Sequence, residues 1–436
     1  MKILVAGAGH GGLAAAGLLA QRGARVTVFE RSAEEAMGYD WTDVFNLACL
    51  REAGIPLPGP SEYRPANDMT FICPSRKTLT AYASQSEEAV MERRALLRHL
   101  IAFARGCGVE FLFETSVEKP LLEGNRVVGL AVKDKSGMRE HTADLVIDAA
   151  GMNSPVRTQL PESLGIVRQF RRDQYFTVLR AFFSHTGKAP LGGPWSVYFF
   201  PLGRQCVTWI GEEEGYTDLL CGSFGDTDRA YAEAVRQSVL ERHPTMGDEI
   251  LRGGQVVKIP VRRPLGRMVA DGYAAVGDAA AMTVPLVGSG ICNAIRAGRL
   301  LAETALAPGN KNCTAAQLWP YQVEYMRQIG AVHASLDVLK SFVLSLRPEQ
   351  INCIFERRLL ESPEMTNARV GREVSLTLPQ MAVRGLRGAG HLPLLLRMAG
   401  TLSASRRLKR HALRIPARYD EEAVKAWARV YEGIGW

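Results

Sequence analysis

The residues with the clearest chemical meaning lie near the start of the chain, where four glycines surround one histidine. This G-x-G-x-x-G loop follows an apolar segment and precedes one rich in Ala and Leu. In such a loop the first glycine allows a tight turn, the second lets the backbone approach a pyrophosphate, and the third lets a helix pack closely on a strand. Glu30 lies eighteen residues after Gly12, at the end of the next apolar segment, where a carboxylate can accept hydrogen bonds from both hydroxyls of a ribose. The pattern predicts a dinucleotide-binding cradle, and the alternative is a chance cluster of glycines. The residues expected to form the cradle are Gly7, Gly9, His10, Gly11, Gly12, Glu30 and Arg31.

A second group of informative residues lies much later in the chain. Gly277 and Asp278 end an apolar segment, and a Pro-x-x-Gly-x-Gly turn then opens a helix of small residues. A carboxylate at this position can hydrogen-bond a ribityl hydroxyl, and the NH groups and dipole of the helix N-terminus can bind the pyrimidine edge of a flavin. NAD has no ribityl chain and needs no such motif. The alternative interpretation is a capping aspartate followed by a glycine turn. The two groups together predict FAD. The residues of the second group expected to bind it are Gly277, Asp278, Pro285, Gly288, Ser289, Gly290 and Ile291.

A third block, residues 92–100, has arginines followed by leucines at steps of three and four. With the groups above and the motif of residues 148–157, which contains Ala150-Gly151 and follows the apolar segment 145–147, it resembles the p-hydroxybenzoate-hydroxylase-like superfamily of FAD enzymes, and within it most closely the geranylgeranyl reductases, over about residues 1–310. The resemblance implies that the first arginine of this helix lies over the FAD pyrophosphate. The leucine spacing assigns that role to Arg93, with Arg94 as the competitor and an exposed helix cation as the other interpretation. Val117 is also expected among the cofactor-binding residues.

Small departures bear on the subfamily. Ala281 replaces the histidine that aromatic hydroxylases of the superfamily carry after Gly-Asp-Ala-Ala, and the spacing after Gly288 is that of the reductases. The reductases, however, have Glu where Ser289 stands, and residues 196–201 keep only the Phe-Pro and one aromatic residue of their Tyr-x-Trp-x-Phe-Pro motif. Residues 38–43 replace their cysteine-bearing loop. The resemblance therefore implies a reductase of carbon-carbon double bonds in an apolar, isoprenoid substrate. The alternatives are an FAD monooxygenase using NAD(P)H and oxygen, and a lipid-binding protein on a related fold, as in Rab GDP-dissociation inhibitors.

The elements that must position these residues alternate between two regions of the chain. We expect an α/β (α+β) fold, in which a Rossmann-like FAD-binding domain is interleaved with an antiparallel-sheet substrate domain, followed by a helical region. The FAD-binding domain comprises residues 1–66, 90–157 and 267–310, the substrate domain residues 67–89 and 158–266, and the helical region residues 311–436. Strands are expected in the substrate domain within 69–82, 175–183, 195–200, 205–210 and 255–259, with a helix near 227–242.

The substrate domain should roof the flavin and enclose a substrate cavity. No catalytic residue can be named, but aromatic residues are candidates for the cavity wall, with core packing as the alternative for each: Trp41, Trp195, Tyr198 and Phe200. No second G-x-G-x-x-G follows a strand. We therefore expect an external electron donor, either NAD(P)H or a reductase protein.

Composition and charge limit the remaining choices. The eight cysteines show no C-x-x-C spacing, which indicates reduced thiols in a cytoplasmic protein and no metal site. No run of eighteen apolar residues predicts a membrane-spanning helix. Residues 372–418 hold nine Arg and one Lys against a single Glu, in a chain of net charge +8. The mixture of cations and leucines in 391–418 suits peripheral contact with an anionic membrane, whereas a solvated helix face or a subunit contact are the alternatives. No nucleic-acid-binding module accompanies the charge, so no nucleic-acid partner is expected.

Overall fold

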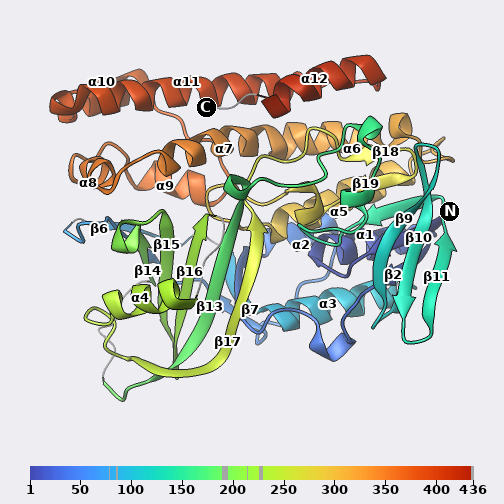
Figure 1. The fold of residues 1–436 in the computed structure, drawn as a ribbon, viewed down its shortest axis with the longest axis horizontal. Coiled ribbons are helices and arrows are strands. Elements are labelled where there is room, and N and C mark those ends of the chain that lie inside the picture. The colour runs from blue at the N-terminus through green and yellow to red at the C-terminus, as the bar shows by residue number, and fades with distance from the viewer. Residues whose placement is uncertain (78, 85–86, 189–194, 214, 225–228, 434–436) are drawn as a thin grey trace.

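Two large sheets and a layer of helices make up the molecule (Figure 1). The computed structural model describes residues 1–77, 79–84, 87–188, 195–213, 215–224 and 229–433. One large sheet lies beside the N-terminus, the other lies at the opposite end with α4, and the C-terminal helices run along one edge of both. This is the predicted mixed α/β fold with a helical C-terminal region.

The six-stranded sheet draws its strands from three separated segments of the chain. Its order is β18 (Val269–Ala270), β19 (Tyr273–Ala275), β12 (Leu145–Asp148), β1 (Lys2–Ala6), β2 (Arg25–Phe29) and β8 (Glu110–Leu112), and all neighbouring pairs except β18 with β19 are parallel. Its central strands are almost continuously apolar and buried, as expected for a parallel sheet covered on both faces. The helices that accompany this sheet are α1 (His10–Gln21), α3 (Arg93–Gly106) and α5 (Ile291–Ala305).

The small residues of α1 and α5 let these helices lie in close contact. A Cβ added to Gly298 would lie 2.8 Å from the backbone nitrogen of Ala15, and one added to Gly11 would lie 3.2 Å from the Cβ of Ala294. The N-termini of both helices are therefore held at the carboxyl edge of the same sheet, where ligands bind in open α/β folds.

The seven-stranded sheet contains every strand predicted for the substrate domain. Its order is β17 (Met246–Pro260), β13 (Tyr175–His185), β16 (Tyr216–Phe224), β15 (Cys206–Glu213), β14 (Trp195–Phe199), β5 (Met69–Ile72) and β6 (Leu79–Tyr82), and only β14 with β5 is parallel. The predicted helix near 227–242 is α4 (Arg229–Val239), and residues 227 and 228 lie outside the described residues. Two strand segments were not predicted from the sequence: β16 and the first half of β17.

Two smaller sheets and one short helix complete the N-terminal part. One sheet is an antiparallel meander of β9 (Ser116–Glu123), β10 (Arg126–Asp134) and β11 (Gly137–Thr142). The other pairs β3 (Thr42–Asn46) and β4 (Tyr63–Pro65) with the central β7 (Glu88–Glu92), and α2 (Ala48–Ala53) follows β3. The start of β3 contacts the seven-stranded sheet, because Thr42 Oγ1 accepts a hydrogen bond from Arg180 of β13.

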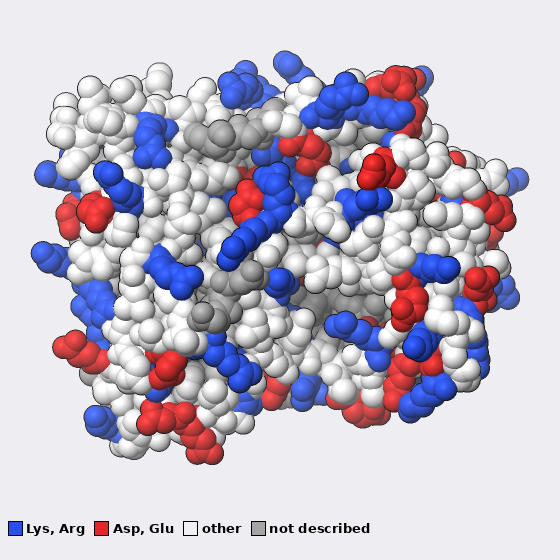
Figure 2. Space-filling model, viewed as in Figure 1, with Lys and Arg blue, Asp and Glu red and all other residues white. Residues whose placement is uncertain are grey.

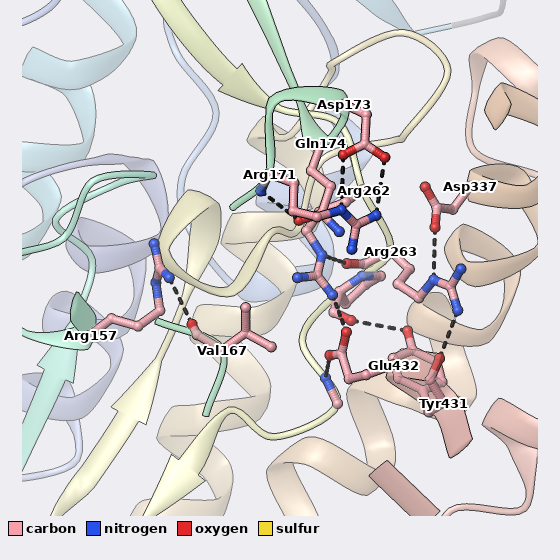
Figure 3. Close-up of polar contacts among 12 residues, drawn as sticks. Arg157, Val167, Arg171, Asp173, Gln174, Arg262, Arg263, Asp337, Tyr431 and Glu432 are labelled. Carbon is pink, nitrogen blue, oxygen red and sulfur yellow. Dashed lines mark hydrogen bonds and ion pairs between the residues drawn. The ribbon is translucent and has the colours of Figure 1, made fainter. Parts of the chain in front are cut away.

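The C-terminal region is helical, as predicted. It comprises α6 (Ala315–Tyr325), a π-helical turn (Met326–Gly330), α7 (Ala331–Leu344), α8 (Pro348–Glu356), α9 (Ser362–Arg369), α10 (Leu378–Arg387), α11 (Leu392–Leu413) and α12 (Glu421–Gly433). Helix α12 contacts the segment that leads from β17 back to the six-stranded sheet (Figure 3). Among the described helices, no single one has the length and apolar character to span a membrane; only a pair bent by 113°, 315–344 with 348–356, meets that test together.

Candidate functional site

The glycine loop joins β1 to α1 and requires glycine at two positions in particular. Gly7 has φ +92°, and a Cβ there would lie 2.7 Å from the carbonyl oxygen of Ala149. A Cβ at Gly12 would lie 2.6 Å from the carbonyl oxygen of Gly7. The first bond of the helix runs from Leu13 N to Gly9 O at 2.9 Å, so the three amide groups before Leu13 precede the helical bonding pattern and are available to a ligand at the helix N-terminus.

Glu30 lies at the end of β2, beside the glycine loop. Its carboxylate accepts a hydrogen bond from Ala8 N at 3.0 Å and another from Ser32 N at 2.9 Å. Each oxygen keeps a further lone pair, so the carboxylate can still accept two hydroxyl groups. Arg31 is exposed next to it. Val117 is half-buried in β9, two residues after Thr115, whose amide donates to the Glu30 carbonyl at 2.9 Å.

Arg93 lies at the start of α3 and forms an ion pair that the sequence did not reveal. Its Nε and Nη2 donate to the two carboxylate oxygens of Asp43, each at 2.7 Å. The guanidinium lies over the ring of Trp41, 4.8 Å from its centroid. Burial opposes ionisation of Asp43, but Arg93 outweighs it and holds the pKa of that carboxyl below its usual value. Arg94, the competitor, makes one long hydrogen bond within the described part of the chain, from Nε to Gly38 O at 3.5 Å.

His10 adds a buried polar group to this corner of the site. Its Nε2 is buried and has no hydrogen-bond partner among the described residues. Burial, reinforced by the charge of Arg93, lowers the pKa of His10 to about 4, so the ring is neutral at pH 7. An unpartnered buried nitrogen is uncommon in folded proteins and indicates a position where a ligand atom or water binds.

Asp278 lies in the short 3-10 helix Gly277–Ala280, directly facing the turn before α5. Its carboxylate has no hydrogen-bond partner within the described part of the chain, and burial raises its pKa to about 6 although Arg93 acts in the opposite direction. A Cβ at Gly290 would lie 3.6 Å from Asp278 Oδ1. Gly290 precedes α5 without a side-chain cap, and Gly288 has φ +71°. The structure thus brings the carboxylate together with the turn Pro285–Ile291, in which Ser289 is exposed and Ile291 is buried.

Asp148, two residues before the Ala150-Gly151 pair, serves the fold. It is fully buried and accepts hydrogen bonds from Ser154 Oγ at 2.6 Å and Tyr273 OH at 3.0 Å. Burial raises its pKa. Its partners fix the loop that follows β12 beneath the glycine loop.

The seven-stranded sheet presents a polar and aromatic surface to the cradle. Arg180 of β13 donates to Asp218 of β16 through Nε at 2.9 Å and to Thr42 Oγ1 at 2.9 Å. Its guanidinium carbon lies 5.8 Å from the ring of Trp41 and 5.1 Å from that of Trp209. Trp209 packs on Trp195 with their ring centroids 4.7 Å apart. Sequence reasoning missed Arg180, Asp218 and Trp209, which become a group only through strand pairing.

The four aromatic candidates do not form one wall. Trp41 and Trp195 lie on the sheet face that meets the cradle, but Tyr198 lies on the opposite face, among residues that pack under α4. Its hydroxyl bonds His243 Nε2 at 2.9 Å, and His243 Nδ1 lies 3.1 Å from Glu212. Phe200 follows the end of β14 with φ +48° and shares a core with Trp195 and the C-terminal helices. Period-two alternation separates positions 195 and 198, and could have indicated this.

These observations fit FAD. A Cβ would clash with the backbone at Gly7 and Gly12, and two helix N-termini converge on one edge of the sheet. Among the described residues, His10 Nε2 and the Asp278 carboxylate have no hydrogen-bond partner. The fold and the site are those of a flavoprotein that binds FAD at the carboxyl edge of a Rossmann-like sheet.

Comparison with known proteins agrees with this class. Residues 1–201 match the family described as FAD binding domain. A digeranylgeranylglycerophospholipid reductase of Sulfolobus acidocaldarius is 24% identical over 99% of this chain and 96% of the relative, and that of Methanothrix thermoacetophila is 27% identical over 80% and 89%. The chain is an FAD-dependent oxidoreductase similar to geranylgeranyl reductases, as the motifs predicted.

Solved structures share the fold. A geranylgeranyl bacteriochlorophyll reductase-like protein of Thermoplasma acidophilum superposes with a TM-score of 0.70 at 17% identity, covering 92% of this chain and 98% of the other. PqsL of Pseudomonas aeruginosa, a probable FAD-dependent monooxygenase, gives 0.58 at 22% identity, covering 82% and 99%. The fold is therefore shared with a reductase-like protein and with a probable monooxygenase, and the fold alone does not decide the activity.

Proposed function

We propose that this protein reduces carbon-carbon double bonds in an apolar, isoprenoid lipid substrate with FAD as its redox group. The main support is the set of curated relatives, which are named digeranylgeranylglycerophospholipid reductases. The similarity covers 99% of this chain for one of them and 85% for another. The apolar surroundings agree: Trp195 and Val197 of the seven-stranded sheet share a core with Phe342 and Leu394 of the C-terminal helices.

In this proposal each part of FAD has its own set of residues. The loop Gly7–Gly12 and the N-terminus of α1 bind the pyrophosphate, Glu30 binds the ribose, and Asp278 binds the ribityl chain. The N-terminus of α5 binds the pyrimidine edge. His10, whose Nε2 has no partner among the described residues, would contact the pyrophosphate, and Arg93 of the Asp43–Arg93 pair lies over the ring of Trp41. When bound and reduced, FAD would supply a hydride to one carbon of the double bond, and a proton from solvent would complete the addition at the other carbon.

The test is an anaerobic assay. FAD-loaded protein is reduced with dithionite and mixed with a geranylgeranyl phospholipid, and the product is analysed by mass spectrometry. We expect uptake of two hydrogen atoms per double bond in the absence of oxygen. An oxygenated product that forms only in air would instead support a monooxygenase, which is the second candidate because PqsL shares the fold. Since the electron donor is external in this proposal, NADH, NADPH and reduced ferredoxin are compared as donors in place of dithionite.

We further propose that the molecule collects its substrate at a membrane surface through the leucine patch, defined as Leu378, Val383, Leu386, Leu392 and Leu396. These side chains are between 47% and 79% exposed, although large apolar side chains are usually covered. The corner of the molecule at α10 and the start of α11 carries few charges, with Lys and Arg around it (Figure 2). Most of the patch precedes the cations of residues 391–418. One of these cations, Lys409, already pairs with Glu373 at 2.6 Å.

Vesicle sedimentation tests the patch. Changing Leu386 and Leu396 together to Gln should weaken binding to vesicles of anionic phospholipid at least fivefold, because apolar burial is removed while the charge stays the same. The matched control changes Leu122 of the β9 meander, which is also exposed, to Gln. Equal binding of both variants would contradict the membrane proposal. It would not bear on the proposed reductase activity, which is measured on detergent-dissolved substrate.

A further inference from the structure

Arg93, at the start of α3, is held in one orientation by the segment that leads into β3. Its Nε and Nη2 donate to the two carboxylate oxygens of Asp43, each at 2.7 Å. A two-point pair of this kind fixes the plane of the guanidinium as well as its position. The rings of Trp41 and Tyr39 lie 4.8 Å and 5.4 Å from the guanidinium carbon, so the same segment also limits motion out of that plane.

The pair leaves one nitrogen of Arg93 for a ligand. Nη1 has no hydrogen-bond partner among the described residues, and it is not one of their buried polar atoms that lack a partner, so it is accessible. The exposed fraction of the Arg93 side chain is 21%. Arg180 differs, because each of its three side-chain nitrogens already donates to another residue. Both NH groups of Arg93 Nη1 are therefore open to an acceptor.

The guanidinium of Arg93 lies on the cofactor side of the pair. Its charge adds to the burial that lowers the pKa of His10, which belongs to the glycine loop, and opposes the burial that raises the pKa of Asp278. Arg93 is thus close enough to act on both residues. In FAD the pyrophosphate lies between the adenosine ribose and the ribityl chain. A phosphate oxygen is therefore the acceptor expected between the glycine loop and Asp278.

The ion pair itself carries no net charge. Asp43 is 9% exposed, and Arg93 keeps the pKa of its carboxyl below the usual value, so the carboxylate is ionised at neutral pH. A carboxylate close to a pyrophosphate site would repel the ligand unless it had another effect. The effect that the geometry allows is directional: Asp43 turns a long, flexible cation into a donor whose two remaining NH groups have a fixed direction.

We propose that Asp43 is a positioning residue, which directs Nη1 of Arg93 to a phosphate oxygen of FAD without contacting the cofactor itself. This inference rests on FAD as the cofactor in the proposed function and adds a residue that acts through another. It does not depend on which substrate the reduced cofactor acts upon.

A double-mutant cycle tests the proposal, with FAD binding to the apoprotein followed by quenching of flavin fluorescence. Asp43→Ala should raise the FAD dissociation constant about tenfold, because Nη1 loses its fixed direction although the cation remains. In the Arg93→Ala background the same change should leave the constant unchanged or lower it, since it then only removes an anion near the pyrophosphate. Asp43→Asn keeps the size of the side chain and replaces Asp43→Ala in the cycle if that variant does not fold.

A lysine at position 93 separates positioning from a purely structural role of the pair. Arg93→Lys keeps the charge and can still pair with Asp43, but it lacks the rigid fork that holds one nitrogen towards the ligand. We expect the melting temperature of the apoprotein to stay close to that of the wild type, while the FAD dissociation constant rises about tenfold. The matched control is Glu34→Ala, which removes the two-point partner of Arg105 near the other end of α3 and should leave FAD binding unchanged.

The outcomes separate this inference from the proposed function. Unchanged FAD binding by both Asp43 variants overturns the positioning role. An equal loss of affinity in the wild-type and Arg93→Ala backgrounds also overturns it, because Asp43 would then act independently of Arg93. Normal FAD binding by Arg93→Lys would reduce the pair to a structural contact between α3 and β3. All three results leave the dithionite assay of the wild type untouched, whereas a wild-type protein that does not bind FAD would overturn both proposals.

Discussion

Two groups of buried arginines in this molecule differ in how completely their polar atoms are satisfied. One contains Arg262 and Arg263, in the segment between β17 and the six-stranded sheet (Figure 3). None of their buried side-chain atoms lacks a hydrogen-bond partner in the described structure. The other group, around Arg180 and Arg93, lies beside the glycine loop and next to unpartnered atoms of His10, Trp41 and Trp209, whereas the unpartnered atoms near the first group are Arg157 Nε and Tyr325 OH. The first group has the features of a structural lock, and the second those of a ligand site.

The lock is built from elements distant in the sequence. Glu432 of α12 accepts from Arg262 at 2.5 Å and from Gly266 N at 2.7 Å. Arg263 donates to Asp337 of α7 and to the carbonyl oxygen of Tyr431, each at 2.7 Å. The C-terminal helices therefore hold the segment that connects the two large sheets, and so contribute to the relative position of cradle and roof.

The largest effect on the free energy of unfolding is expected from a change at Asp337, the partner of Arg263 in the first group. Changing it to Ala leaves Arg263 and Lys340 buried without their carboxylate, which should lower the free energy of unfolding by about 3–5 kcal/mol in urea titrations. The control Asp173→Ala removes an exposed partner of Arg171 and should cost no more than about 1 kcal/mol. Similar losses in the two variants would show that the buried group is not a lock.

The second effect concerns the ligand side of the comparison. Asp278→Ala removes one or two charge-assisted hydrogen bonds to the ribityl chain, each contributing about 1.5–3 kcal/mol. The FAD dissociation constant, measured by quenching of flavin fluorescence, should rise at least tenfold. The apoprotein should be no less stable at pH 8, because the variant loses a carboxylate whose ionised form burial disfavours. Normal flavin retention by this variant would mean that the carboxylate does not contact the cofactor.

The sequence predicted the ligand side better than the lock, for a physical reason. The glycine loop and the end of β2 depend on backbone requirements that lie within one local segment, so their residue types alone identify them. Arg93 with Asp43, and Arg180 with Asp218, are partners 50 and 38 positions apart, and their pairing follows only from the packed sheets. No local pattern marks Arg263 and Tyr431 as partners, since they are 168 positions apart.

The strands that were missed teach the same lesson. The segment of β16 contains Thr217 and Asp218, which break the apolar pattern because Asp218 faces Arg180. The part of β17 from Met246 to Gly254 is mostly exposed or half-buried, and it contains Gly253 and Gly254, both at positive φ. In both segments long-range pairing with β13 outweighs an unfavourable local pattern.

The smallest effect, and the most specific one, is the pH dependence of FAD binding. In the apoprotein the pKa of Asp278 is raised from 3.8 to about 6 by burial, so the folded state binds more protons than the unfolded state between these values. This group therefore supports the apoprotein fold at low pH, and that contribution is lost as the pH rises through about 6. Ribityl hydroxyls favour the ionised carboxylate, so FAD binding below pH 6 must release a proton. The FAD dissociation constant should fall about tenfold between pH 5 and pH 7 at constant ionic strength. Asp278→Asn should abolish this dependence, since His10, with a pKa of about 4, does not titrate in this range. If the Asn variant kept the same dependence, the titrating group would lie elsewhere, and Asp278 would not be the unsatisfied acceptor that distinguishes the ligand site from the lock.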